Sequence, residues 1–290
     1  MSNLRLLNEY EEITFDRLEV GIGHSAHVFP KVRLADIFPI RNSGISNEEY
    51  SYCLKSHFDF LITDKNYLPL FSVEYDGSFH RLDKHQIEND KIKNAMCERF
   101  SHPILRINSL YITKEYKGID LLTYFIDVWF FEKAFDDAQR SGVVSFDEVF
   151  DPCFIASDGK DRKWPYWLSS EIQVKIRSLH RLGKIEQAAP SHWVGIDDEG
   201  NYRCICWVEV GNDKVVFVKT GMRKQYFQAV LVSDLLSMLA MFDLDKKLEK
   251  YFLDESIGVT TSDFRSILNG FCSELEPRQL AKSGSIACPI

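Results

Sequence analysis

Two apolar segments joined by a short polar turn constrain this fold most. His57–Thr63 (HFDFLIT) and residues 68–76 (LPLFSVEYD) are rich in the aromatic and aliphatic residues that favour β-strands, and residues 64–66 (DKN) between them are turn formers. They predict a β-hairpin. Alternation also places Glu74 and Asp76 on one face of the second strand, so two carboxylates lie side by side near its C-terminal end.

The flanking segments extend this hairpin into an α/β core. Residues 8–20 carry a buried stripe that predicts a helix, and residues 27–34 (HVFPKVRL) predict a strand. After the hairpin, residues 83–100 predict a second helix and residues 103–107 (PILRI) a fourth strand. The order helix, strand, strand, strand, helix, strand indicates an α/β fold with a mixed sheet.

Beyond this core the pattern predicts a second, smaller domain. Residues 119–135 form a helix that is apolar around most of its circumference, and Gly, Asp, Ser and Pro accumulate between Arg140 and Pro165. We therefore expect an N-terminal domain over residues 1–140 and an α+β domain over residues 141–290. The second domain has no motif that specifies chemistry, and recognition of substrate, of a partner protein or of a second copy of the chain all remain open.

Composition excludes several classes of protein. The 290 residues are 45% hydrophobic, which supplies a packed core and excludes a disordered chain. The formal charge of −8 excludes a protein that coats nucleic acid by bulk positive charge. Acidic residues near the start and the absence of a long apolar run predict neither a signal peptide nor a membrane span, and the seven scattered cysteines suit reduced thiols. We expect a cytoplasmic protein.

Three carboxylates indicate a metal site. Asp59 interrupts the apolar run of the first hairpin strand, and cross-strand pairing is expected to bring it near Glu74 and Asp76. Clustered carboxylates repel one another and are costly to bury unless a cation neutralises them. A hard divalent ion with oxygen ligands, Mg²⁺ or Mn²⁺, is the economical explanation. The alternative is that these acids are ordinary residues at the ends of strands.

Basic groups follow the carboxylates along the chain. His80 comes shortly after the strand, and Asp90 and Lys93 share one stripe of the next helix. A lysine that faces carboxylates suits a site that must hold an anion beside a metal. A surface pair between Lys93 and Asp90 remains the alternative, and would contribute only a few tenths of a kcal/mol.

These motifs resemble a known family. The string VEYDGSFH at residues 73–80, the D-x-x-K spacing of Asp90 and Lys93, and PILRI after them are similar to the restriction-endonuclease-like PD-(D/E)XK superfamily. More narrowly, they resemble a bacterial branch with the pattern E-x-D-G-x-x-H, related to very-short-patch-repair-type endonucleases. The resemblance covers residues 8–115 and implies a restriction-endonuclease-like mixed sheet flanked by helices.

The resemblance also implies roles for individual residues. Asp59 would match the first metal-binding aspartate and Glu74 the second acidic ligand, while Glu11, or equally its neighbour Glu12, would match the acid of the first helix. The chain departs from the superfamily at Asp76, where lysine is the rule. Lys93 would then supply the amine.

The function implied is that of a divalent-metal-dependent nuclease. Asp59, Glu74 and Asp76 would bind the metal, and Glu11, His80 and Lys93 would assist; His80 is either a general acid or base or a loop anchor. DNA rather than RNA is implied by the resemblance alone. The alternative is a nuclease-like domain that has lost catalysis and serves as a nucleic-acid or protein binding module.

A stripe of basic residues is the candidate contact for the substrate backbone. Residues 170–184 predict a helix, on which Arg177, Arg181 and Lys184 lie on one face. A nuclease needs such local cations because phosphate contacts provide most of the affinity for nucleic acid. A solvated helix face without function is the alternative.

Overall fold

The computed structural model describes residues 5–77, 84–152, 154–157, 162–227 and 230–287. The chain divides into two compact units. The N-terminal unit comprises Met1–Ser145 together with Gln225–Ala229, and the C-terminal unit comprises Phe146–Lys224 and Val230–Ile290. A short segment that is distant in the sequence therefore belongs to the N-terminal unit. Within the described ranges, no helix is both long enough and apolar enough to cross a membrane.

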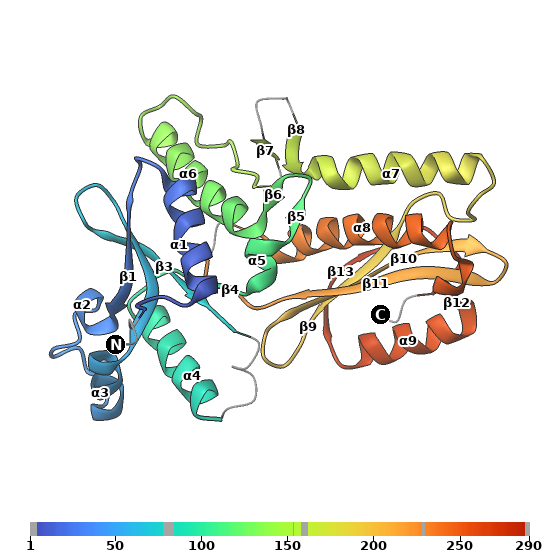
Figure 1. The fold of residues 1–290 in the computed structure, drawn as a ribbon. Coiled ribbons are helices and arrows are strands. Elements are labelled where there is room, and N and C mark those ends of the chain that lie inside the picture. Colours follow the sequence, from blue (N-terminus) through green and yellow to red (C-terminus); the bar gives the residue numbers. More distant parts are fainter. Residues whose placement is uncertain (1–4, 78–83, 153, 158–161, 228–229, 288–290) are drawn as a thin grey trace. The chain divides into compact units, whose positions relative to one another are not determined.

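The N-terminal unit is built on a mixed four-stranded sheet in the order β1-β2-β3-β4 (Figure 1). Strands β1, β2 and β3 are antiparallel neighbours, whereas β3 and β4 run parallel. The elements of this unit are α1 (Glu9–Ile22), β1 (His27–Arg33), α2 (Leu34–Ile37), α3 (Asn47–Lys55), β2 (His57–Thr63), β3 (Pro69–Tyr75), α4 (Lys84–Arg99), β4 (Ile104–Ile107), α5 (Ser109–Thr113), β5 (Glu115–Tyr116), β6 (Ile119–Asp120) and α6 (Leu121–Arg140).

Helices cover both faces of this sheet. On one face Phe15 of α1 contacts Phe60, and Trp129 of α6 contacts Phe71. On the other face, Phe58 belongs to a buried cluster with residues of α2, α3 and α4. The predicted order of elements is wrong between the first two strands, where the structure has α2 and α3. The nine residues of α3 begin with a capping box between Ser46 and Glu49, which stabilises a short, polar helix.

A segment from the second half of the chain, residues 225–227, contacts the edge of the same sheet. Tyr226 forms an isolated antiparallel bridge with Ile104, and the side chain of Gln225 bonds to both backbone groups of Arg106. Phe227 packs against both Phe71 and Trp129, which also contact each other. These contacts close the otherwise unpaired side of β4, so backbone groups there do not remain unsatisfied.

The C-terminal unit is a five-stranded antiparallel sheet in the order β12-β11-β10-β9-β13. Helix α8 packs on β10 and β11 and is itself covered by α7, while α9 packs on the opposite face through Phe264 and Leu268 (Figure 1). The elements are β7 (Phe154–Ser157), β8 (Arg162–Pro165), α7 (Tyr166–Arg181), β9 (Ser191–Ile196), β10 (Tyr202–Gly211), β11 (Lys214–Met222), α8 (Val232–Tyr251), a 3-10 turn (Glu255–Ile257), β12 (Val259–Thr260), α9 (Thr261–Ser273) and β13 (Glu276–Ala281).

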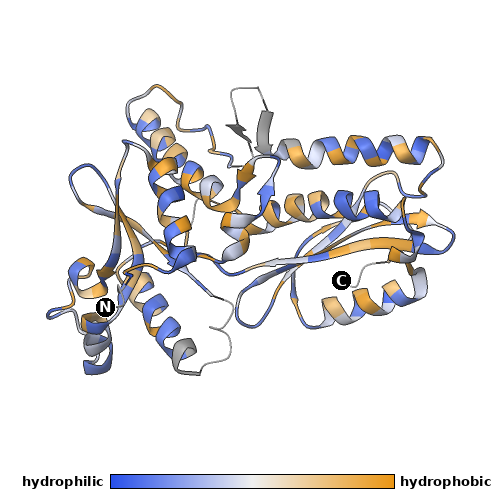
Figure 2. Ribbon diagram, in the orientation of Figure 1, coloured by the Kyte–Doolittle hydropathy of each residue, from blue (hydrophilic) through white to orange (hydrophobic). Residues whose placement is uncertain are grey.

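Helix α7 carries the predicted basic residues on an exposed face. Ile172 and Ile176 are buried, whereas Arg177 and Arg181 are exposed, and Figure 2 shows hydrophilic and hydrophobic residues alternating along this helix. The helix ends at Arg181, before Lys184. Gly183 has a φ of 66°, a left-handed conformation that glycine adopts without strain and that terminates the helix. Lys184 is exposed but lies in the turn beyond the helix, which corrects the expectation of one helical stripe.

Candidate functional site

The backbone pairing of β2 and β3 ends next to Asp59 and Glu74. The paired register stops at Phe60 and Val73. One residue further, the backbone N–H of Asp59 donates to Oε1 of Glu74 at 3.1 Å, and the N–H of Tyr75 donates to Oδ2 of Asp59 at 2.9 Å. Between these two strands, the backbone N–H groups of Asp59 and Tyr75 thus donate to side-chain carboxylates, whereas elsewhere in the sheet such N–H groups donate to backbone carbonyls. The structure brings Asp59 and Glu74 together across the two strands, as cross-strand pairing predicts, and each carboxylate bonds to the other strand.

Lys93 approaches Glu74 from helix α4. Its Nζ donates to Oε2 of Glu74 at 2.6 Å and to the carbonyl oxygen of His57 at 2.9 Å. Both side chains are about nine-tenths buried, with exposed fractions of 10% for Lys93 and 9% for Glu74. Removal from water raises the pKa of the Glu74 carboxyl above its usual range, although Lys93 opposes that change. Burial lowers the pKa of Lys93, but attraction to Glu74 outweighs it, so the pKa is raised and the ammonium stays charged.

Lys31 of β1 connects Asp59 to the first helix. Its Nζ donates to Oδ1 of Asp59 at 2.7 Å and to Oε1 of Glu11 at 2.9 Å. Glu11 is buried and is held by a capping box with Asn8 at the start of α1. Glu12 bonds instead to Arg5. Of the two candidate acids of this helix, Glu11 is therefore the one that is connected to Asp59 through Lys31.

Glu11, Lys31, Asp59, Glu74 and Lys93 therefore form one network, which we call the carboxylate–lysine network. Three carboxylates and two ammonium groups leave one excess negative charge when all are ionised. Burial lowers the pKa of Lys31, but its bonds to Asp59 and Glu11 outweigh this effect and raise the pKa. Lys31 is not among the candidate residues selected from the sequence. Its one distinguishing feature there is that it is a charged residue between Pro30 and Val32, inside a predicted strand.

Asp76 lies outside this network. Its Oδ1 accepts a hydrogen bond from Arg106 of β4 at 3.1 Å, and the same guanidinium nitrogen donates to Asp90 at 3.2 Å. Arg106 is only 2% exposed and also bonds to Asn94. Sequence reasoning missed Arg106 too, although a single charge inside the strand ILRI signals a buried partner.

The expected three-carboxylate metal cluster is not assembled by Asp59, Glu74 and Asp76. Across the part of the chain that the structure describes, no group of three or more His, Cys, Asp or Glu side chains is placed to hold a metal ion. Asp76 is instead directed to Arg106, because β4 runs parallel to β3 and pairs Arg106 with Glu74 in register. His80, the remaining candidate, lies outside the described residues.

Asp59 and Glu74 by themselves fit a hard divalent cation. Each of their four carboxylate oxygens accepts one hydrogen bond, and a carboxylate oxygen offers two acceptor positions. Mg²⁺ is held in many phosphoryl-transfer sites by one or two carboxylates plus water and substrate phosphates, so two hard oxygen ligands suffice. The excess negative charge of the carboxylate–lysine network favours a cation in the same place.

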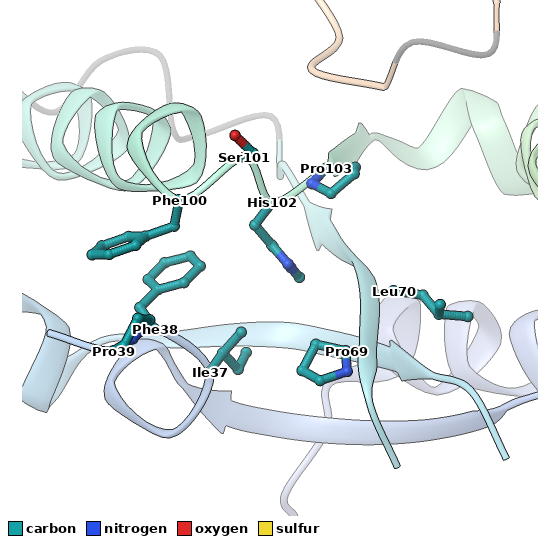
Figure 3. A pocket seen from close by; sticks show the side chains of 9 residues that line it. All are labelled: Ile37, Phe38, Pro39, Pro69, Leu70, Phe100, Ser101, His102 and Pro103. Carbon is teal, nitrogen blue, oxygen red and sulfur yellow. The ribbon is translucent and has the colours of Figure 1, made fainter. Parts of the chain in front are cut away.

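A pocket of about 300 Å³ lies at the other ends of β3 and β4 (Figure 3). Its lining comprises Ile37, Phe38, Pro39, Pro69, Leu70, Phe100, Ser101, His102 and Pro103. The rings of Phe38 and Phe100 stack at 4.9 Å, and the ring of His102 lies between them and Pro69 in Figure 3. Burial lowers the pKa of His102 to about 4, so the lining is uncharged at neutral pH and lacks a group that attracts phosphate.

Comparison with known proteins gives one match. Residues 3–120 match the model of a family described as "Protein of unknown function (DUF2726)". No curated protein and no solved structure matches the chain. The matched residues include α1, the four strands of the N-terminal sheet and α4, and hence every member of the carboxylate–lysine network. The part of the chain that carries the candidate site is thus similar to a family whose function is not established.

Proposed function

We propose that the chain is a divalent-metal-dependent nuclease that hydrolyses phosphodiester bonds in DNA. One observation carries the proposal: Asp59 and Glu74 are joined where the β2–β3 ladder ends, and each carboxylate is bonded to a lysine. Paired hard oxygen ligands beside cationic groups suit the hydrolysis of an anionic diester. The motif resemblance of residues 8–115 points to the same chemistry, and DNA as the substrate rests on that resemblance.

Asp59 and Glu74 would hold Mg²⁺ or Mn²⁺ in this reaction. A bound divalent cation supplies charge neutralisation at the phosphate and a more acidic water at neutral pH. Lys93 fixes the orientation of Glu74 by occupying its Oε2, and the N–H of Tyr75 fixes that of Asp59. The side chain of Lys93 is too buried to contact a large substrate, so we assign it to positioning. Arg106 similarly holds Asp76 beside the site.

The exposed cations of the C-terminal unit would contact the DNA backbone. Arg177, Arg181 and Lys184 are all exposed on or just after α7. Cations that contact phosphates contribute affinity that falls steeply with salt concentration and carries little sequence information. This assignment explains how a chain with a net charge of −8 binds a polyanion through a local patch.

Cleavage of labelled linear and supercoiled DNA tests the proposal. We expect the purified full chain to cleave in Mg²⁺ or Mn²⁺ but not in EDTA. Asp59→Ala should reduce the rate by at least about 10²-fold, because metal-ion catalysis supplies several kcal/mol of transition-state stabilisation. Glu12→Ala is the matched control: it removes a neighbouring acid that bonds to Arg5 and not to the network, and should leave the rate unchanged. A folded wild-type chain that cleaves neither DNA nor RNA would overturn the proposal.

The second candidate function is a nuclease-like module that binds without catalysis. It is favoured by Asp76 at the position where the resemblance calls for lysine, and by the internal neutralisation of Asp59 and Glu74 by lysines. Thermal unfolding with increasing Mg²⁺ or Mn²⁺ separates the two. An intact metal site raises the melting temperature, since 100 times Kd of ligand adds about 2.7 kcal/mol. An unchanged melting temperature, together with retained DNA binding, would favour the module.

A further inference from the structure

We propose that Lys31 is the catalytic amine of the site, the group that contacts the substrate phosphate. This inference rests on the proposed nuclease function and assigns to Lys31 a role that the family resemblance implied for Lys93. Lys31 is positioned for it by three features: its contact with Asp59, the partial exposure of its side chain, and its unusual backbone conformation.

The two lysines of the carboxylate–lysine network differ in access to solvent. Lys93 donates to Glu74 and to the backbone of His57, its ammonium lies 5.5 Å from the ring centre of Phe58, and its side chain is 10% exposed. The side chain of Lys31 is 28% exposed. An ammonium group has three N–H donors, and Lys31 uses two of them on Glu11 and Asp59. The third is available to a phosphate oxygen.

Lys31 also has a backbone conformation that strands avoid. Its φ is 55°, in the left-handed region, although it lies inside β1 between the paired residues Pro30 and Val32. Such a conformation is strained for a residue other than glycine, and persists where the surrounding structure determines it. In this conformation Lys31 forms ion pairs with both Glu11 and Asp59. The strained backbone position is therefore also the one whose ammonium bridges the two acids.

The Lys31 ammonium would offset part of the negative charge that a phosphodiester brings to the site. A phosphodiester brings a further negative charge to a network that already has one more carboxylate than lysine. A divalent cation held by Asp59 and Glu74 offsets part of this charge, and Lys31 is bonded directly to Asp59. An ammonium beside the developing charge on phosphate stabilises the transition state most when it is already oriented. Glu11 and Asp59 provide that orientation.

The test compares lysine variants in one cleavage and binding series. Lys31→Gln should lower kcat by about 10²-fold or more, the effect of losing one oriented charge donor. Lys31→Arg keeps the charge and should recover at least a tenth of wild-type activity. Lys117→Gln is the matched control, because Lys117 is an exposed lysine with a φ of 54° in the turn between β5 and β6. It should behave as wild type. Urea titrations establish that each variant is folded.

Two further readouts separate Lys31 from the metal ligands. Lys31→Gln should keep the increase in melting temperature that Mg²⁺ produces, whereas Asp59→Ala should lose it. In fluorescence anisotropy with a labelled DNA oligonucleotide, Lys31→Gln should bind more weakly than wild type by at least threefold. If Lys31→Gln cleaves and binds like wild type while Asp59→Ala is inactive, the role of Lys31 is rejected and the nuclease function stands. If the folded wild type cleaves neither DNA nor RNA, both are rejected.

Discussion

Replacing Lys93 with methionine is expected to lower the free energy of unfolding of the N-terminal unit by about 3–5 kcal/mol at pH 7. The ammonium of Lys93 lies 2.6 Å from Glu74, and both side chains are about nine-tenths buried. Methionine fills similar space but leaves a carboxylate buried without its cation. Because burial already raises the pKa of Glu74, the loss should shrink as the pH falls and Glu74 becomes protonated.

Urea titration read by amide hydrogen exchange in β2 and β3 measures this loss in the N-terminal unit alone. The matched control is Lys91→Met, which changes an exposed lysine of the same helix and should alter stability by less than about 0.5 kcal/mol. The double variant Lys93→Met with Glu74→Gln should recover much of the loss, since it removes the buried charge but keeps an acceptor for the N–H of Asp59. Equal effects of Lys93→Met and Lys91→Met would show that the ion pair does not stabilise the fold.

Lowering the pH from 6.5 to 4 is expected to destabilise the N-terminal unit by about 3 kcal/mol through His102 alone. Burial lowers the pKa of this histidine to about 4, because its ring lies against Phe38 and Phe58 and is largely removed from water. Its Nε2 is hydrogen-bonded to Ser72. Between pH 4 and 6.5 the unfolded chain therefore binds a proton that the folded chain does not. The contribution is fully present above pH 6.5 and is lost as the pH falls to 4.

The comparison of wild type with His102→Gln isolates this contribution from that of the carboxylates. The variant should show a smaller decrease in unfolding free energy over this interval, measured by urea titrations at several pH values. His27→Gln changes an exposed histidine of the same sheet and should keep the wild-type slope. Parallel curves for wild type and His102→Gln would contradict the assignment of a buried, neutral imidazole.

Local sequence patterns predict much of the N-terminal sheet. The two apolar segments and the turn residues between them predict a hairpin within one residue of the observed strands, because strand propensity and turn chemistry act over a few residues. Helix α1 begins directly after its N-cap residue Asn8, where the predicted helix also begins. The missed helix α3 has nine residues and a single buried side chain, Cys53, so it lacks the apolar stripe that identifies longer helices.

The candidate site is predictable in part. Pairing of the two predicted hairpin strands brings Asp59 near Glu74, and helical spacing offers Lys93 toward the carboxylates. Lys31 and Arg106 escape prediction because their partners depend on how separate strands pair. Lys31 meets Asp59 across β1 and β2, and Arg106 reaches Asp76 because β4 runs parallel to β3.

The amino-acid sequence alone determines the strands, the main helices and the types of charged residue that face the sheet, since these depend on residue order and propensity. Only the tertiary structure decides how the charges are paired. It joins Asp59 and Glu74 to two lysines and assigns Asp76 to Arg106. The physical reason is that a buried charge needs a partner within a few ångström, and strand register and helix packing select that partner from residues far apart in the chain.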